Sequence, residues 1–277
     1  MTTLLQILRA KGLSNSSAKK LLKSGKVRLH GIPTADGGRI VKPEDIDIRS
    51  NSPRMIVGRD PVIVHREDGF VVVWKPANYL SVPAHNRRKE YSVISFVRRI
   101  CDASYAVHRL DEGTSGLMLV ATTEATQQIL KASLEERKVH RAYLAIAKGH
   151  IREKKTINTL FVRNRGDGLR GSAPRGEQNG KRAITHIRPV ERLKKATLLE
   201  AILDTGRTHQ IRIHLSEWGH PIIGDDLYGR IQKGENRLAL HAWKLRFPHP
   251  TTKKEMGFFA PLADDLERMR RNLSRGS

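Results

Sequence analysis

The stretch that decides the fold runs from His108 to Ala121 and reads HRLDEGTSGLMLVA. Its last part, Leu117 to Ala121, is an uninterrupted apolar run, which predicts a buried strand. The part before it holds Asp111 on a segment punctuated by Gly113 and Gly116. A carboxylate on a tight loop that leads into a buried strand is held rigidly and stays reachable from a cleft, so Asp111 is a candidate nucleophile. The alternative is a structural acid paired with its basic neighbours, because ion pairs often imitate sites.

Apolar runs on both sides of this stretch are separated irregularly by helical patterns. We expect strands at residues 70–74, 117–121, 143–147, 198–203 and 238–247, and helices at 92–101, 125–136, 209–218 and 262–271. Strands outnumber helices and do not alternate with them regularly, which favours an α+β fold over a doubly wound one. The sequence therefore predicts a mixed, mainly antiparallel central sheet with flanking helices over residues 55–277, after a polar break at residues 51–53.

Residues 1–50 are expected to form a separate small α/β unit. Helices are predicted over Leu4–Ala10 and after the cap-rich segment 14–17, with Gly25 ending the second, and strands at 27–29, 40–41 and 46–48. The second helix has an apolar stripe of Ala18, Leu21 and Leu22. Its opposite side is crowded with lysines, namely Lys19, Lys20, Lys23 and Lys26. This face suits contacts with phosphate groups, or it is an ordinary solvated charged surface.

The composition points to a polyanionic partner. The 277 residues include 51 Lys and Arg against 28 Asp and Glu, a formal net charge of +23. Aromatic residues make up 5%, so phosphate contacts rather than base stacking should supply most of the affinity for a nucleic acid. No apolar run approaches the ~20 residues that a membrane crossing needs. The single cysteine, Cys101, excludes an internal disulfide and a multi-cysteine metal site and favours a reduced, cytoplasmic compartment.

The order His-Arg-Leu-Asp-x-x-Thr-Ser-Gly from His108 to Gly116 resembles the signature of the RluA-type pseudouridine synthases. Other segments resemble that family's motifs in the same order: Val73–Ala77 with Val82-Pro83, Arg141–Ala145, Thr205–Leu215 with Gly219–Asp225, Leu240–Ala242 and Phe247–Pro250. The resemblance runs from about Ile63 to Leu262. Separately, Ser17–Gly31 resembles the αL-type RNA-binding domain of a small-subunit ribosomal protein, without the acidic residue usual near the start of the first helix.

The resemblance implies isomerisation of a uridine in RNA, with no cofactor, metal or energy source. Asp111 would start cleavage of the glycosidic bond, by attack on the sugar or by proton abstraction from it. Arg212 matches an arginine that would orient the aspartate through a charge-assisted, potentially bidentate contact. Tyr143 matches a tyrosine that packs on the base and helps to remove a proton, although its pattern also fits an amphipathic tyrosine on a half-buried strand. Arg109 matches a residue that enters the space left by the extruded uridine.

Further basic residues among these motifs are expected to bind RNA: Lys75, Arg207 and His209. The spacing of His209, His214 and His220 does not match a His-Glu-x-x-His zinc motif, and neighbouring arginines would repel a cation, so we expect no metal site. The Gly- and Arg-rich residues between 161 and 182 are expected to form a mobile basic loop that orders on RNA, with a disordered hairpin insert as the alternative.

The αL-like segment favours ribosomal RNA, particularly that of the large subunit, as the substrate, and transfer RNA is the alternative. A monomer is the default expectation for this resemblance. A non-catalytic RNA-binding or ribosome-assembly protein would have no need to retain Asp111, Tyr143 and Arg212 together. A metal-dependent nuclease would need a cluster of acidic residues that the sequence lacks. Asn78 stands where the family's Lys-Pro motif commonly continues with a nearby glycine, so the loop through Ala84 is expected to have its own shape.

Overall fold

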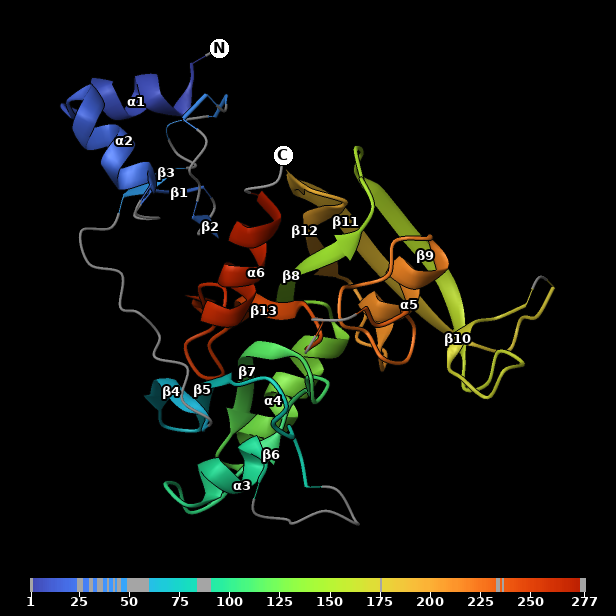
Figure 1. The fold of residues 1–277 in the computed structure, drawn as a ribbon. Coiled ribbons are helices and arrows are strands. Elements are labelled where there is room, and N and C mark those ends of the chain that lie inside the picture. The colour runs from blue at the N-terminus through green and yellow to red at the C-terminus, as the bar shows by residue number, and fades with distance from the viewer. Residues whose placement is uncertain are drawn as a thin grey trace. The chain divides into compact units, whose positions relative to one another are not determined.

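The computed structural model describes residues 2–23, 27–29, 32–33, 37–38, 40–41, 43, 46–48, 60–83, 91–174, 176–232, 235 and 237–274. The chain divides into two compact units, Met1–Ile56 and Val57–Ser277 (Figure 1).

The first unit packs two helices and a small antiparallel sheet around one apolar cluster. Helices α1 (Leu4–Ala10) and α2 (Asn15–Lys23) precede strands β1 (Val27–Leu29), β2 (Ile32–Pro33) and β3 (Ile46–Ile48), which pair in the order β2-β1-β3. Thr3 begins α1 with a capping box, in which its hydroxyl accepts from the Gln6 amide and the Gln6 side chain accepts from the Thr3 amide. The buried cluster joins both helices and β1: Leu4, Leu8, Ala18, Leu22 and Val27.

The predicted elements of this unit are mostly confirmed. Both helices and the strands at 27–29 and 46–48 are present. The strand expected at 40–41 is wrong, because Ile40 forms only an isolated bridge with Thr3, and β2 takes that place in the sheet. Gly25 lies outside the described residues.

The second unit is built on one mixed sheet with the strand order β10-β9-β11-β12-β8-β13-β7-β5-β4 (Figure 1). The strands are β4 (Val62–Glu67), β5 (Phe70–Lys75), β6 (Tyr105–Ala106), β7 (Ser115–Ala121), β8 (His140–Lys148), β9 (Lys155–Val162), β10 (Gly171–Ser172), β11 (Lys181–Leu193), β12 (Ala196–Leu203), β13 (Leu240–Pro248) and β14 (Glu255–Phe259). Strand β14 pairs with β13, and β6 pairs with β7. The β13–β7 pair is parallel and the other strand pairs are antiparallel, so the predicted mixed, mainly antiparallel sheet is confirmed.

Among the described residues of this unit, four helices accompany the sheet at the predicted places. They are α3 (Val93–Arg98), α4 (Glu124–Glu135), α5 (Gln210–Glu217) and α6 (Asp264–Ser274). Ser92 and Thr123 cap α3 and α4, each accepting a hydrogen bond from a backbone amide of the first turn. In the described part of the chain, no helix has both the length and the apolar character that a bilayer span requires.

Residues 163–172, within the loop predicted to be mobile, form a hydrogen-bonded turn in this structure. The Asn164 carboxamide oxygen accepts from the amides of Gly166 and Gly168, and the Asp167 carboxylate accepts from Arg165. Glu217 of α5 then accepts from both the amide and the hydroxyl of Ser172. These local polar contacts order the turn even though the segment has little to bury.

Candidate active site

The site lies at the middle of the sheet, where neighbouring strands bring together distant parts of the chain. In the strand register Tyr143 of β8 pairs with Ala242 of β13, and Ala242 pairs with Gly116 of β7. A Cβ on Gly116 would lie 2.2 Å from the carbonyl oxygen of Ala242, and its φ is +114°. Only glycine permits this close approach. The loop that carries Asp111 therefore meets the sheet beside Tyr143.

A hydroxyl from another loop fixes the backbone next to Asp111. Ser81 donates to the Leu110 carbonyl at 2.6 Å and accepts from the Leu110 amide at 2.9 Å. The Thr114 amide donates to the Asp111 carbonyl at 3.0 Å, which closes the turn. The carboxylate itself is 17% exposed, so it is shielded by its surroundings and still open to a cleft.

Arg212 reaches Asp111 from helix α5 but is bound more closely by a different aspartate. Its Nη1 lies 3.8 Å from Asp111 Oδ2, whereas Nε and Nη2 donate to the buried Asp225 at 2.9 and 2.7 Å. Nη2 also donates to Asp226 at 3.0 Å. The predicted bidentate contact with Asp111 is therefore wrong, because Asp225 occupies the fork of the guanidinium. Burial opposes the charge of Arg212, but the hydrogen bond and charge of Asp225, with the charge of Asp111, raise its pKa above the usual value.

His209 faces the other oxygen of Asp111. Its Nε2 lies 3.9 Å from Asp111 Oδ1, and its Nδ1 lies 3.1 Å from the hydroxyl of Tyr228. The backbone of His209 is left-handed, with φ 59°, at the residue that begins α5. Gln210, buried just behind it, holds the preceding turn by accepting from the Thr205 hydroxyl at 2.8 Å and from the Arg207 amide at 3.0 Å. Burial lowers the pKa of His209, and the charge of Asp111 opposes that shift.

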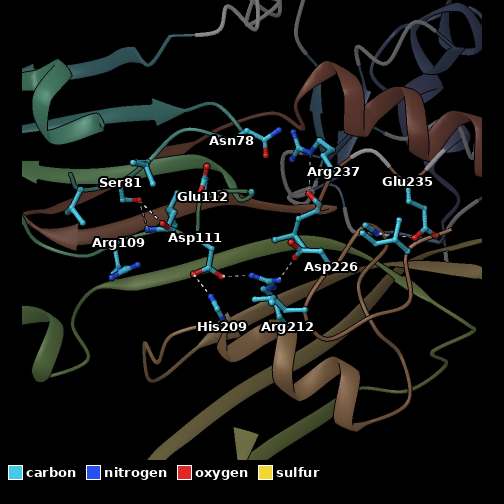
Figure 2. Close-up of a pocket in the computed structure, with 18 residues that line it drawn as sticks. Asn78, Ser81, Arg109, Asp111, Glu112, His209, Arg212, Asp226, Glu235 and Arg237 are labelled. Carbon is cyan, nitrogen blue, oxygen red and sulfur yellow. Dashed lines mark hydrogen bonds and ion pairs between the residues drawn. The ribbon is translucent and has the colours of Figure 1, made fainter. Parts of the chain in front are cut away.

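Two cavities meet at these residues. The smaller, of about 240 Å³, is lined by Asp111, Tyr143, Arg212 and Leu240 among others. The larger, of about 580 Å³, lies on the other side of Asp111 and is drawn in Figure 2. The border that both share consists of Arg109, Leu110, Asp111, His209 and Arg212. Tyr143 is buried, and burial raises the pKa of its phenol, with a further contribution from Asp111.

Of the predicted RNA-binding residues, some lie beside the cavities in the second unit and others on helix α2 of the first unit. Arg109 is exposed and lines both cavities, and Arg207 is exposed with its Nε donating to the Arg182 carbonyl at 3.0 Å. Lys19 and Lys20 are exposed on α2 in the first unit. The side chain of Lys23 and the whole of Lys26 lie outside the described residues.

Lys75 needs correction, because its side chain does not reach the surface. It is 0% exposed, and its Nζ donates to the carbonyls of Pro76, Tyr79 and Glu112 at 3.0, 2.6 and 2.9 Å. Burial lowers the pKa of Lys75 to about 7, although the charge of Asp111 favours the ammonium. Lys75 therefore ties the end of β5 to the loop of Asp111 and cannot serve as a phosphate contact.

The histidines considered as metal ligands each contact different hydrogen-bond partners. His214 lies between the hydroxyls of Thr159 and Thr185, and Nδ1 of His220 lies 2.9 Å from the Lys148 carbonyl. Within the described ranges, no group of three or more His, Cys, Asp or Glu residues is arranged to hold a metal ion.

Sequence reasoning missed Asp225, Asp226 and Tyr228. The segment Gly219–Asp225 stands out as a motif, but nothing in it shows that Asp225 pairs with Arg212, which lies 13 positions earlier. A buried carboxylate is usually paired with a cation, and this general rule is the one signal in the sequence that points to a basic partner for Asp225.

Comparisons with known proteins agree with this fold. The solved structure of human RNA Pseudouridylate Synthase Domain Containing 1 superposes with a TM-score of 0.64 at 28% identity, covering 80% of this chain and 98% of that one. The "Ribosomal large subunit pseudouridine synthase D" of Xylella fastidiosa is 35% identical over 280 residues, covering 91% of this chain and 82% of the relative. The protein of the same name from Vibrio parahaemolyticus is 33% identical, covering 92% and 85%.

The fold and site thus define an enzyme that acts on RNA. The family model described as RNA pseudouridylate synthase matches residues 69–217. The chain belongs to this family, in its RluA-type branch, and is an RNA pseudouridine synthase.

Proposed function

We propose that this enzyme converts uridine to pseudouridine in large-subunit ribosomal RNA, with Asp111 as the reacting carboxylate. The substrate is supported by two relatives that are named for the large ribosomal subunit and match nearly the whole chain. The observation that carries the assignment of Asp111 is its position between Arg212 and His209, at 3.8 and 3.9 Å, on the border of two cavities.

The reaction is an isomerisation that leaves the composition of the RNA unchanged. The bond from the ribose to a ring nitrogen of uracil breaks, and a bond from the same ribose carbon to carbon 5 forms. Carbon 5 loses a proton, and the freed nitrogen gains one. Asp111 starts this sequence by attack on the sugar or by taking a proton from it, and both routes require an ionised carboxylate. The guanidinium of Arg212, 3.8 Å from Asp111 Oδ2, places a positive charge beside this carboxylate.

Tyr143 packs on the uracil in this proposal. Its phenol lines the smaller cavity together with Asp111, and its raised pKa keeps it protonated at neutral pH. That protonation state favours packing over removal of the carbon 5 proton by Tyr143 alone.

The remaining assignments concern RNA outside the reacting base. Arg109 is exposed and lines both cavities, which suits a side chain that fills the space of an extruded uridine. Residues 1–50 act as the αL-type RNA-binding module, with Lys19 and Lys20 exposed for phosphate contacts and Arg207 adding another contact beside the active site. The enzyme acts as a cytoplasmic monomer.

The test is tritium release from RNA labelled at carbon 5 of uridine. Unmodified large-subunit ribosomal RNA and unmodified transfer RNA are supplied separately to the native protein and to Asp111→Asn. We expect release only from the ribosomal RNA and only by the native protein. Release from transfer RNA alone would move the substrate to that class, and equal release by Asp111→Asn would remove Asp111 from its role.

A further inference from the structure

The larger cavity has no part in the chemistry proposed above. It extends from the shared border toward the loop that follows β5 and the segment around Asp226 and Leu238 (Figure 2). Its volume of about 580 Å³ falls within the range of about 300 to 1,000 Å³ typical of sites for small organic groups. Because RNA is a continuous polymer, a nucleotide next to the reacting uridine must lie near this border.

The walls of this cavity expose apolar side chains to solvent. Leu227 is 44% exposed and Ile231 is 55% exposed, and both line the cavity together with Leu80, Val82 and Leu238. Exposed large apolar groups gathered at a hollow indicate a binding surface more often than scattered ones do. Flat apolar walls suit the face of a nucleobase.

Two polar groups project into the same space with hydrogen-bonding capacity to spare. The side chain of Asn78 is exposed and has no hydrogen-bond partner among the described residues. Asp226 is 70% exposed, and its one contact within the described part of the chain is Oδ1 with Arg212. A carboxylate only accepts hydrogen bonds, so a ligand here must offer N–H or O–H groups. By contrast, the guanidinium of Arg237 is occupied by Asp265 and Ser115.

The backbone conformation of Asn78 does not by itself explain why an asparagine stands at this position. Its φ is 59°, a left-handed conformation for which glycine or asparagine is favoured. A glycine would satisfy the backbone alone. Asparagine adds an amide that can donate and accept at the edge of a base, as it does when it pairs with adenine.

We propose that this cavity binds the base of a nucleotide adjacent to the reacting uridine and selects a base with an exocyclic amino group. The amide of Asn78 pairs with the base edge and holds it in the register at which the amino group donates to Asp226, so the selection depends on Asn78, while Leu227 and Ile231 cover the face of the base. A uracil in the same position would set a carbonyl against the carboxylate and leave both acceptors unsatisfied. This inference rests on the proposed function, because it takes the reacting uridine to lie in the smaller cavity.

The experiment uses the full chain and an unmodified large-subunit ribosomal RNA transcript. Pseudouridines formed by the native protein are mapped, and a hairpin around one such site is made with each of the four bases at both adjacent positions. Turnover and binding of every hairpin are measured for the native protein, Asn78→Gly and Leu227→Trp. Val64→Trp is the matched control, because Val64 is a similarly exposed apolar residue on β4, outside both cavities.

At one adjacent position, replacing an amino-bearing base by uridine should lower kcat/KM of the native protein about tenfold. Asn78→Gly should reduce this preference to less than about threefold, and Leu227→Trp should weaken binding of the preferred hairpin while Val64→Trp does not. Equal turnover with all bases at both positions, or an unchanged preference in Asn78→Gly, would overturn the subsite.

The subsite and the proposed function fail in different ways. If the transcript is bound but not modified, hairpins are taken from the fragments that the protein retains, and their base preference is measured by binding alone. If these hairpins show a base preference that Asn78→Gly removes, the proposed subsite stands and the proposed ribosomal RNA substrate is refuted. A lack of preference would refute the subsite.

Discussion

Arg212 and Asp225 form a buried bidentate pair at 2.9 and 2.7 Å, behind Asp111, the carboxylate proposed to react. Asp111 Oδ2 lies 3.8 Å from Nη1 of the same guanidinium, so it interacts with the positive charge of Arg212 but does not form the bidentate hydrogen bonds. This division has a chemical consequence, because a carboxylate that attacks or takes up a proton loses its charge during the reaction. In the proposed reaction, an arginine held only by Asp111 would lose its partner at that point, whereas the pair with Asp225 would keep Arg212 in place.

Replacing Asp225 should therefore damage both stability and turnover. Asp225→Ala leaves a buried guanidinium without its main partner and also removes the acceptor for the Leu227 and Tyr228 amides, which should cost about 3–5 kcal/mol of unfolding free energy. Asp226→Ala is the control, because that exposed partner of Arg212 should contribute about 1 kcal/mol or less. Urea unfolding of both variants measures the difference, and similar losses in the two would contradict the anchoring role of Asp225.

Tyr228 should influence the reaction through His209. Tyr228→Phe removes the hydroxyl that lies 3.1 Å from His209 Nδ1, so the ring beside Asp111 loses its orientation. Because a neutral hydrogen bond contributes about 1 kcal/mol, we expect kcat to fall roughly fivefold with little change in KM. Steady-state kinetics on unmodified ribosomal RNA measure this. An increase in KM at constant kcat would instead place Tyr228 in RNA binding.

Gly116 should not tolerate even a methyl side chain. Gly116→Ala would force a Cβ to within 2.2 Å of the Ala242 carbonyl, which backbone atoms cannot avoid without separating β7 from β13. Gly168→Ala is a matched control, since Gly168 also has a positive φ but nothing within 4 Å of its added Cβ. We expect Gly168→Ala to lose about 1 kcal/mol and Gly116→Ala at least about 3 kcal/mol in thermal or urea unfolding. Equal losses would show that the strand contact tolerates a methyl group.

The elements predicted correctly from sequence are those whose pattern is local. The apolar run that became β7 is buried at every position, and a run of that kind needs no knowledge of its neighbours to be recognised. Strands β9 and β11 were missed because each has one partly exposed face, so polar residues interrupt the apolar pattern. The partner of Arg212 and the burial of Lys75 were missed for a different reason. Both depend on which loops meet across the sheet, and spacing along the chain does not show that.

Acid should destabilise the enzyme partly through His108. Burial lowers the pKa of His108 to about 3, with the charge of Arg141 acting in the same direction, and the ordinary value is 6.5. Between these values the unfolded chain holds a proton that the folded chain lacks, so the free energy of unfolding falls as the pH falls from 6.5 toward 3.

The variant His108→Gln isolates this contribution. A glutamine oxygen can replace Nε2 as the acceptor for the Leu119 amide, now at 3.1 Å, without titrating. Urea unfolding between pH 4.5 and 8 should show a pH slope smaller by about 1.4 kcal/mol per unit below pH 6.5. The same slope in the variant and the native protein would mean that His108 binds its proton equally well in the folded and the unfolded chain.

The lysines of α2 should determine part of the salt dependence of RNA binding. Lys19 and Lys20 are exposed beside the buried Ala18, so their ammonium groups are free to replace counterions on phosphates. Each lost phosphate contact should reduce the slope of log K against log salt by about 0.7 to 0.9. The variant with both Lys19→Gln and Lys20→Gln should therefore bind ribosomal RNA with a slope of log K against log salt that is smaller by up to about 1.8. Lys11→Gln, at an exposed lysine that ends α1, serves as the comparison. Turnover at saturating RNA should be unchanged, because these residues belong to the first unit and Asp111 to the second. A full slope in the double variant would show that α2 presents a solvated surface and that the phosphate contacts lie elsewhere.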